Sequence, residues 1–161
     1  MKRKYTFMTV AISIALLNCS PEKTKTTNES NAVEIEKTTN TETDVLLAPI
    51  DGYFTIIKPL EVKSVLIKNQ NEFDENFHPA KTMTNKIPQI DFTTNNVGAI
   101  VMPTSEYDTK IVINKSYVKE NVLYIRYSAD KSKEKRTFST IPQLLFTFSS
   151  SLKVDSIQID K

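Results

Sequence analysis

Cys19 is the single cysteine of this 161-residue chain, and its thiol is a nucleophile when it is ionised. A lone thiol can be acylated, oxidised or bridged to another chain, but it cannot form an internal disulfide. Basic residues 2–4 and an apolar run from Thr6 to Leu17 precede it. A helix of about twelve residues spans roughly 18 Å, too little for a hydrocarbon core of about 30 Å. The segment therefore predicts a secretory signal peptide at residues 1–18 rather than a membrane-spanning helix.

Leu16, Leu17, Asn18 and Cys19 resemble the lipobox of bacterial lipoproteins, which places a leucine three residues before the cysteine. Leu17 is bulkier than usual, and Asn18 replaces the customary glycine, alanine or serine. The resemblance implies lipidation of Cys19, with a diacylglycerol and an N-acyl chain together giving durable membrane attachment. Ser20, in place of aspartate, implies sorting to the outer membrane. The alternative is an ordinary thiol behind an uncleaved anchor, either buried or free, and a free thiol would be exposed to oxidation.

Residues 19–44 predict a lipidated, disordered tether. After Cys19 they are rich in Thr, Asn, Glu and Lys, and their apolar members are only Ala32, Val33 and Ile35. Such a segment cannot offset the entropy of ordering by burying apolar surface. A flexible chain of about 25 residues reaches roughly 25 to 30 Å, enough to hold a small domain clear of lipid headgroups. Residues 45–161 are then expected to form one β-rich globular domain.

The charge balance argues against a nucleic-acid partner. The chain has 21 basic and 19 acidic residues, and residues 1–18 hold three of the basic ones, so the mature charge is 18 − 19 = −1. Nucleic-acid recognition depends on clustered Lys and Arg. The one basic cluster in the sequence comprises Lys131, Lys133, Lys135 and Arg136. Because Asp130 and Glu134 interleave it, we expect a solvated hairpin tip, the alternative being an anion or glycan site.

The domain offers few residues for catalysis or metal binding. It has one histidine, two glycines and no cysteine, which removes most ways of building a metal site, a thiol nucleophile or a phosphate-binding loop. We expect His78 to be a surface imidazole at a helix end rather than a general base. Glu72, Asp74 and Glu75 are expected to form a solvated first helical turn rather than a calcium site. The sequence thus predicts no enzyme, no cofactor and no metal site.

A tripeptide near the C-terminus has a second possible chemistry. Asp155, Ser156 and Ile157 match the Asp-Ser/Thr-aliphatic pattern of O-glycosylation acceptors in exported proteins of some Gram-negative bacteria. The alternative is a polar pair on an edge strand.

The elements that must position these residues are mostly strands. Asn69 and Glu72 have the spacing of a capping box, and Phe73 and Phe77 lie one turn apart as a core pair, which predicts a helix from Gln70 to Phe77 ended by Pro79. A hairpin is expected to turn at Lys119 to Asn121. We expect an α+β fold, mainly antiparallel β, in a small single domain with one short helix. Apolar alternation and β-branched residues predict strands at Tyr53–Lys58, Val62–Lys68, Val97–Met102, Lys110–Val118, Val122–Ser128, Thr137–Thr140, Gln143–Ser149 and Val154–Ile159.

Residues 62–159 resemble the C-terminal domain of the bacterial protease-complex subunit PrcB. The resemblance rests on the order strand, capped helix with its Phe pair, Ile90-Asp91-Phe92 leading into a buried strand, hairpin, and Ile141-Pro142 before a final apolar strand. That family consists of small exported, often lipidated domains, and its name comes from a member that binds and stabilises a surface protease. The resemblance implies protein binding rather than catalysis.

A candidate binding loop follows the strand that Pro103 ends, and it comprises Thr104, Ser105, Glu106, Tyr107 and Asp108. PrcB-like domains commonly have a Thr-Gly-Gly-Tyr-like turn at this place, whereas this chain has no glycine there, so a left-handed turn does not carry over. Tyr107 is either a partly exposed aromatic anchor for a partner or a residue that closes the core beneath the loop.

These features together predict a lipid-anchored protein of the cell envelope, at the outer membrane, whose domain binds another protein. The membrane contact is through the lipid on Cys19, and the family resemblance suggests a protease as the protein partner. The alternative is an envelope lipoprotein that binds a small ligand or a glycan. An exposed patch would favour a protein partner, a deep aromatic pocket would favour a ligand, and a polar cleft with a perturbed acid pair would favour a hydrolase. The aromatic residues that either kind of binding could use are Tyr53, Tyr107, Tyr117, Tyr124 and Tyr127.

Overall fold

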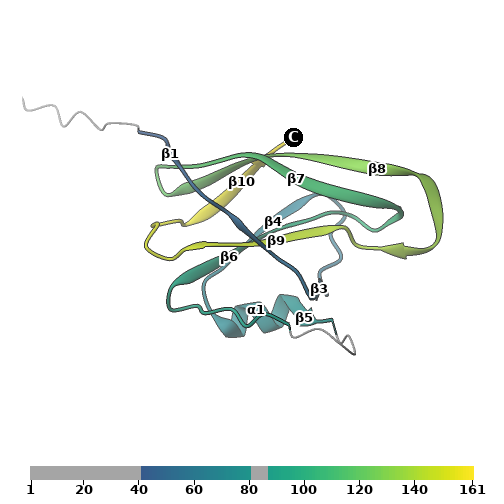
Figure 1. Cartoon of the computed structure of the whole chain (residues 1–161), viewed down its shortest axis with the longest axis horizontal. Helices are drawn as coiled ribbons and strands as arrows, with labels where there is room; N and C mark the ends of the chain where they lie inside the picture. Colours follow the sequence, from purple (N-terminus) through teal and green to yellow (C-terminus); the bar gives the residue numbers. More distant parts are fainter. Residues whose placement is uncertain (1–40, 81–86) are drawn as a thin grey trace, which may run out of the picture. The chain divides into compact units, whose positions relative to one another are not determined.

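The computed structural model describes residues 41–80 and 87–161 (Figure 1). The predicted signal peptide, Cys19 and the tether up to residue 40 lie outside the described residues. Paired backbone begins at β1 (Thr43–Asp44), which belongs to the segment assigned to the tether. Among the described residues, the strands of the domain therefore include residues before residue 45.

Strands dominate the fold, as predicted, and among the described residues they form two four-stranded sheets and one two-stranded sheet. Sheet A has the order β1, β7 (Ser105–Lys119), β8 (Val122–Thr140), β10 (Ser156–Asp160). Sheet B has the order β2 (Ala48–Ile50), β9 (Gln143–Ser149), β6 (Asn95–Val101), β4 (Lys63–Ile67). Sheet C pairs β3 (Tyr53–Thr55) with β5 (Phe77–Pro79). The pairing is mainly antiparallel, but β10 runs parallel to β8, so sheet A is mixed.

Several predicted strands are present with different ends. β9 has the predicted bounds, whereas β3 ends at Thr55 and β10 begins at Ser156. The strand predicted at Thr137–Thr140 is the end of the long β8. The short strands β2 and β5 were not predicted, because each contains a proline, a residue that sheets accept only at edges. Both are edge strands, since β2 ends the order of sheet B and sheet C has only two strands.

Sheet B is the middle layer of the described fold. In Figure 1, β7 and β8 of sheet A run along the top, and α1 (Gln70–Asn76) lies with sheet C at the bottom. Ile100 and Phe146 pack against Leu123 and Ile125 in the core between sheets A and B. A second core lies between sheet B and α1. β6 contributes to both, because successive side chains of a strand point to opposite faces, and every residue from Asn96 to Met102 is buried.

The helix α1 begins as its sequence predicts. Asn69 Oδ1 accepts the Glu72 N–H at 3.0 Å, and the Glu72 carboxylate accepts the Lys68 N–H at 2.9 Å, one residue earlier than in the standard capping box. The helix ends at Asn76 rather than Phe77, because Phe77 is extended (φ −138°, ψ 138°) and starts β5. The rings of Phe73 and Phe77 are both buried, with centroids 5.5 Å apart, which confirms the predicted core pair.

The β7–β8 hairpin turns at Glu120 and Asn121, as predicted. Lys119 pairs with Val122, so the turn has two residues. Both have left-handed backbone, with φ of 51° and 62°. This combination matches the right-handed twist of the flanking strands.

Two residues fix how the layers meet. Gly98 of β6 lies opposite Phe146 of β9, and a Cβ at this position would collide with the phenyl ring. Gln143 of β9 joins sheet B to sheet C through its side-chain amide. Its Oε1 accepts the Thr55 N–H at 2.7 Å, and its Nε2 donates to the Tyr53 carbonyl at 2.6 Å.

Candidate functional site

The prediction that residues Thr104 to Asp108 form a loop was wrong. The last four of these residues are the beginning of β7, and Ser105 pairs with Thr140 near the end of β8. The segment is in a strand because β8 is long enough to supply it with a partner. Glu106, Tyr107 and Asp108 are nevertheless exposed.

The prediction that the basic cluster forms a hairpin tip was also wrong. Residues 131–136 lie within β8, far from the turn at Glu120 and Asn121. Lys131 pairs with Thr109, and Lys135 pairs with Tyr107. The charged run was taken for a turn because it lacks the apolar alternation of a half-buried strand. The structure thus brings together two features that the sequence predicted separately: the candidate binding segment and the basic cluster.

The ladder between these two segments is irregular. Between the pairs Ser105–Thr140 and Tyr107–Lys135, β7 contributes one residue and β8 contributes residues 136–139. Excess residues in one strand bend it and turn its side chains outward. Phe138 lies in this excess, is 58% exposed, and has the Arg136 guanidinium 5.4 Å from its ring centroid. Nothing in the local sequence distinguished Phe138 from a buried phenylalanine.

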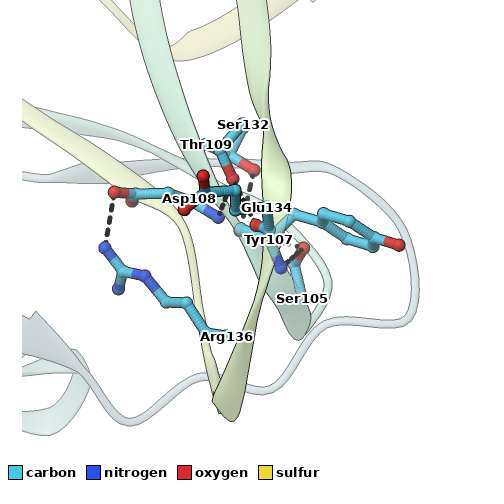
Figure 2. A network of polar contacts seen from close by, with 7 residues as sticks. All are labelled: Ser105, Tyr107, Asp108, Thr109, Ser132, Glu134 and Arg136. Atoms are coloured by element: carbon cyan, nitrogen blue, oxygen red, sulfur yellow. Dashed lines mark hydrogen bonds and ion pairs between the residues drawn. The ribbon is translucent and has the colours of Figure 1, made fainter.

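A polar network holds this irregular end of the hairpin (Figure 2). The Asp108 N–H donates to Ser132 Oγ at 3.1 Å, and Ser132 Oγ donates to the Glu134 carbonyl at 2.8 Å. Arg136 donates to the Asp108 carboxylate. Exposed ion pairs of this kind each contribute little to stability. Their combined geometry, however, fixes the relative position of the two strands where the regular ladder is interrupted.

Neighbouring contacts extend the network on β7. Lys135 Nζ lies 2.7 Å from Glu106 Oε2. Ser105 Oγ accepts the Tyr107 N–H at 3.0 Å and donates to the Tyr107 carbonyl at 3.1 Å. The backbone of Tyr107 is therefore held on both sides. Lys135 and Arg136 are thus each paired with a carboxylate, so only part of the basic cluster is a free cationic surface.

The ring of Tyr107 points away from this network, as Figure 2 shows. It is 38% exposed and belongs to neither core cluster of the described residues. The alternative in which Tyr107 closes the core is therefore wrong. Tyr107 and Phe138 place aromatic surface on the same end of the hairpin, supported by a fixed backbone.

The other candidate residues have structural contacts. His78 is exposed, as predicted, and lies in β5 directly after the C-cap of α1, where its ring stacks on Phe54 with centroids 5.9 Å apart. Asp74 accepts the Gln70 side-chain amide at 2.7 Å. Asp155 lies 3.5 Å from Lys68 Nζ, next to the first residue of the edge strand β10. Within residues 41–80 and 87–161, no group of three or more His, Cys, Asp or Glu side chains is placed to hold a metal ion.

Two of the tyrosines line a separate hollow on the outer face of sheet A. Tyr117 and Tyr124 stack across the strands with ring centroids 5.1 Å apart. The hollow of about 340 Å³ beside them is also lined by Arg126 and Gln158. Tyr127 points the other way into the core, where burial raises the pKa of its hydroxyl, and burial has the same effect on Tyr53.

The comparisons with known proteins add no relative: no protein-family model, no curated protein and no solved structure matches this chain. Among the residues that the structure describes, no helix is long and apolar enough to cross a membrane.

Proposed function

We propose that this chain is a lipid-anchored protein of the cell envelope, attached at the outer membrane through Cys19, and that its β-rich domain binds another protein. The signal-peptide pattern before Cys19 and the polar segment after it support the anchoring. The resemblance of residues 62–159 to PrcB-like domains supports a protein partner and suggests a protease. The proposal gives the domain a binding role and no catalytic one.

The observation that carries the binding role is the exposed aromatic end of the β7–β8 hairpin. Tyr107 and Phe138 are 38% and 58% exposed, and the polar network fixes the backbone that presents them. Aromatic side chains on a rigid support bind well because little conformational freedom is lost on association. The surrounding charges, paired as Lys135–Glu106 and Arg136–Asp108, would form a polar rim around these anchors.

The anchoring is tested by Cys19→Ser with metabolic labelling by an acyl-chain probe. We expect label on the wild type and none on the variant, with the variant still folded, because Cys19 alone offers a thiol for lipid. Equal label on both proteins would contradict the assignment.

The binding role is tested by affinity capture of the anchored protein from solubilised envelopes, followed by binding measurements with the captured partner. Tyr107→Ala should weaken binding by about 1 to 3 kcal/mol with little change in melting temperature, because the ring is an exposed anchor outside the core. Phe54→Ala is the matched control, since Phe54 is a similarly exposed aromatic (49%) on sheet C. Unchanged binding by Tyr107→Ala would refute the assigned site.

A second candidate function is binding of a small ligand or glycan in the hollow beside Tyr117 and Tyr124. The observation that favours it is a concave surface with stacked aromatic rings and several hydrogen-bonding side chains. A glycan panel screened against the wild type and Tyr124→Ala tests it. Binding that Tyr124→Ala removes and Tyr107→Ala retains would select this function over protein binding.

A further inference from the structure

The outer edge of β7 is largely unpaired. β8 accompanies β7 along one side, whereas on the other side β1 pairs only with Tyr117 and Val118. The Val45 N–H adds one more bond, to the Ser116 carbonyl at 3.1 Å. From Ser105 to Lys115, no described strand lies on this edge. The backbone groups of Tyr107 and the Asp108 N–H bond to side chains, so the row of backbone N–H and C=O groups from Lys110 to Lys115 is the template for a further strand.

β1 shows what kind of strand this edge accepts. It runs antiparallel to β7. Of the two residues that flank it, Glu42 has its carboxylate 3.7 Å from Lys115 Nζ, and Val45 is buried in the core between the sheets. The pattern is therefore acidic toward solvent and apolar toward the core. At Leu46, which is 91% exposed, the chain leaves the edge and crosses to β2 in sheet B.

An apolar groove of about 540 Å³ runs beside the free edge. One wall is formed by residues 45–47 and Pro49, the other by residues 111–116 of β7, and Leu144 contributes to the lining. A strand added along residues 110–114 would direct alternate side chains into this groove. On the opposite face it would meet Lys110, which is exposed and takes part in none of the ion pairs of the described residues.

We propose that an extended segment of a partner protein adds to the free edge of β7 as an antiparallel strand, with apolar side chains in the groove and a carboxylate opposite Lys110. The inference rests on the proposed protein-binding function and specifies its mode. Backbone hydrogen bonds give the affinity, and the groove and Lys110 select the sequence.

The test uses the full-length chain in mild detergent and an acetylated, amidated heptapeptide, Thr-Val-Glu-Val-Glu-Val-Thr. Hydrogen exchange read by mass spectrometry should slow within residues 105–115 when the peptide is added. The same peptide N-methylated at every residue should have no effect, because none of its residues can donate a backbone N–H to the edge. No slowing with the first peptide, or equal slowing with both, overturns the proposal.

Two variants test the side-chain contacts. Leu46→Asp should weaken peptide binding by about tenfold or more, the loss from one buried leucine contact, and Lys110→Glu by about two- to fivefold, the loss of an exposed ion pair. Leu60→Asp and Lys133→Glu are matched controls that should bind normally, since Leu60 is 96% exposed and Lys133 is exposed, and neither lines the groove. Equal effects of variants and controls would overturn the assignment.

Other occupants give different results. If exchange within 105–115 is already slow without peptide and quickens on dilution, a second copy of the chain covers the edge. If the amides of this segment that do not bond to β8 exchange slowly at every dilution, residues of the same chain cover the edge. Either result overturns the proposal of a partner strand. If Tyr107→Ala abolishes binding of a captured partner while Leu46→Asp and Lys110→Glu do not, the inference fails and the proposed function stands.

Discussion

Replacing Gln143 with leucine should destabilise the domain by about 2 to 3 kcal/mol. The side-chain amide makes two hydrogen bonds to the backbone of β3, at 2.7 Å to the Thr55 N–H and at 2.6 Å to the Tyr53 carbonyl. Thr55 is only 7% exposed, so its N–H would lose its partner where water has little access, at a cost of about 1 to 3 kcal/mol. Tyr53 is half-buried, so water partly replaces the amide at its carbonyl, and the second loss is smaller.

The matched variant Gln143→Glu separates the two bonds. An ionised carboxylate can accept the Thr55 N–H but is repelled by the Tyr53 carbonyl, whereas a protonated carboxyl can donate to that carbonyl. The folded state therefore favours the protonated form and raises the pKa of the new side chain above its unfolded value of about 4.3. The free energy of unfolding that Gln143→Glu loses relative to the wild type should be smallest below about pH 4.3 and should grow as pH rises through the pKa of the new side chain in the folded state.

The measurement is the denaturant midpoint of each protein at pH 4 and pH 7, with the slope checked for constancy. Hydrogen exchange at Thr55 reports directly on the bond that leucine removes. A loss below about 1 kcal/mol for Gln143→Leu, the net value of one ordinary hydrogen bond, would refute the reasoning. The reasoning would also be refuted if Gln143→Glu lost the same free energy of unfolding, relative to the wild type, at both pH values.

Two further substitutions test other contacts of the fold. Gly98→Ala should lower the free energy of unfolding by about 1 to 3 kcal/mol through overpacking, because the new Cβ meets the fully buried ring of Phe146 and lies 3.0 Å from Ile157 Cδ1. The double variant with Phe146→Leu should recover part of the lost melting temperature. An unchanged melting temperature in the single variant would contradict this prediction. Hydrogen bonds from the Thr93 hydroxyl, the Thr93 N–H and the Thr94 hydroxyl hold the pKa of Asp91 below its usual range. The stability that these hydrogen bonds contribute is present above the unfolded-state pKa of about 3.9, and it is lost as pH falls through the pKa of Asp91 in the folded state. Unfolding midpoints of Asp91→Asn below about pH 4 should therefore vary less with pH than those of the wild type, and identical pH profiles would exclude this role.

The features that the sequence predicted well depend on near neighbours in the chain. Asn69 and Glu72 start a helix because each satisfies a backbone N–H within four residues. The alternation of Leu123, Ile125 and Tyr127 predicted the first half of β8, and all three side chains are buried. These signals are local, so no knowledge of the rest of the fold was needed.

The features that the sequence did not predict depend on distant partners. Residues 129–136 continue β8 because β7 provides an edge, although their own pattern lacks apolar alternation. The parallel pairing of β10 with β8 is likewise a choice between strands that local propensity does not encode. For the same reason, the candidate site was predicted only in part. Its exposed position was predicted, but its strand backbone and its contact with the basic cluster come from the pairing of β7 with β8.

The parallel pairing of β10 also sets the order in which the domain can close during synthesis. Sheet B is complete once β9 has emerged, at Ser149. β8 must wait for Ser156 to Asp160 before its second edge is paired. Until then residues Val122 to Arg126 of β8 carry open hydrogen-bonding groups beside an apolar face, which is a template for pairing with other chains. A chain that stopped at Asp155 would leave this part of β8 open to pairing with other chains.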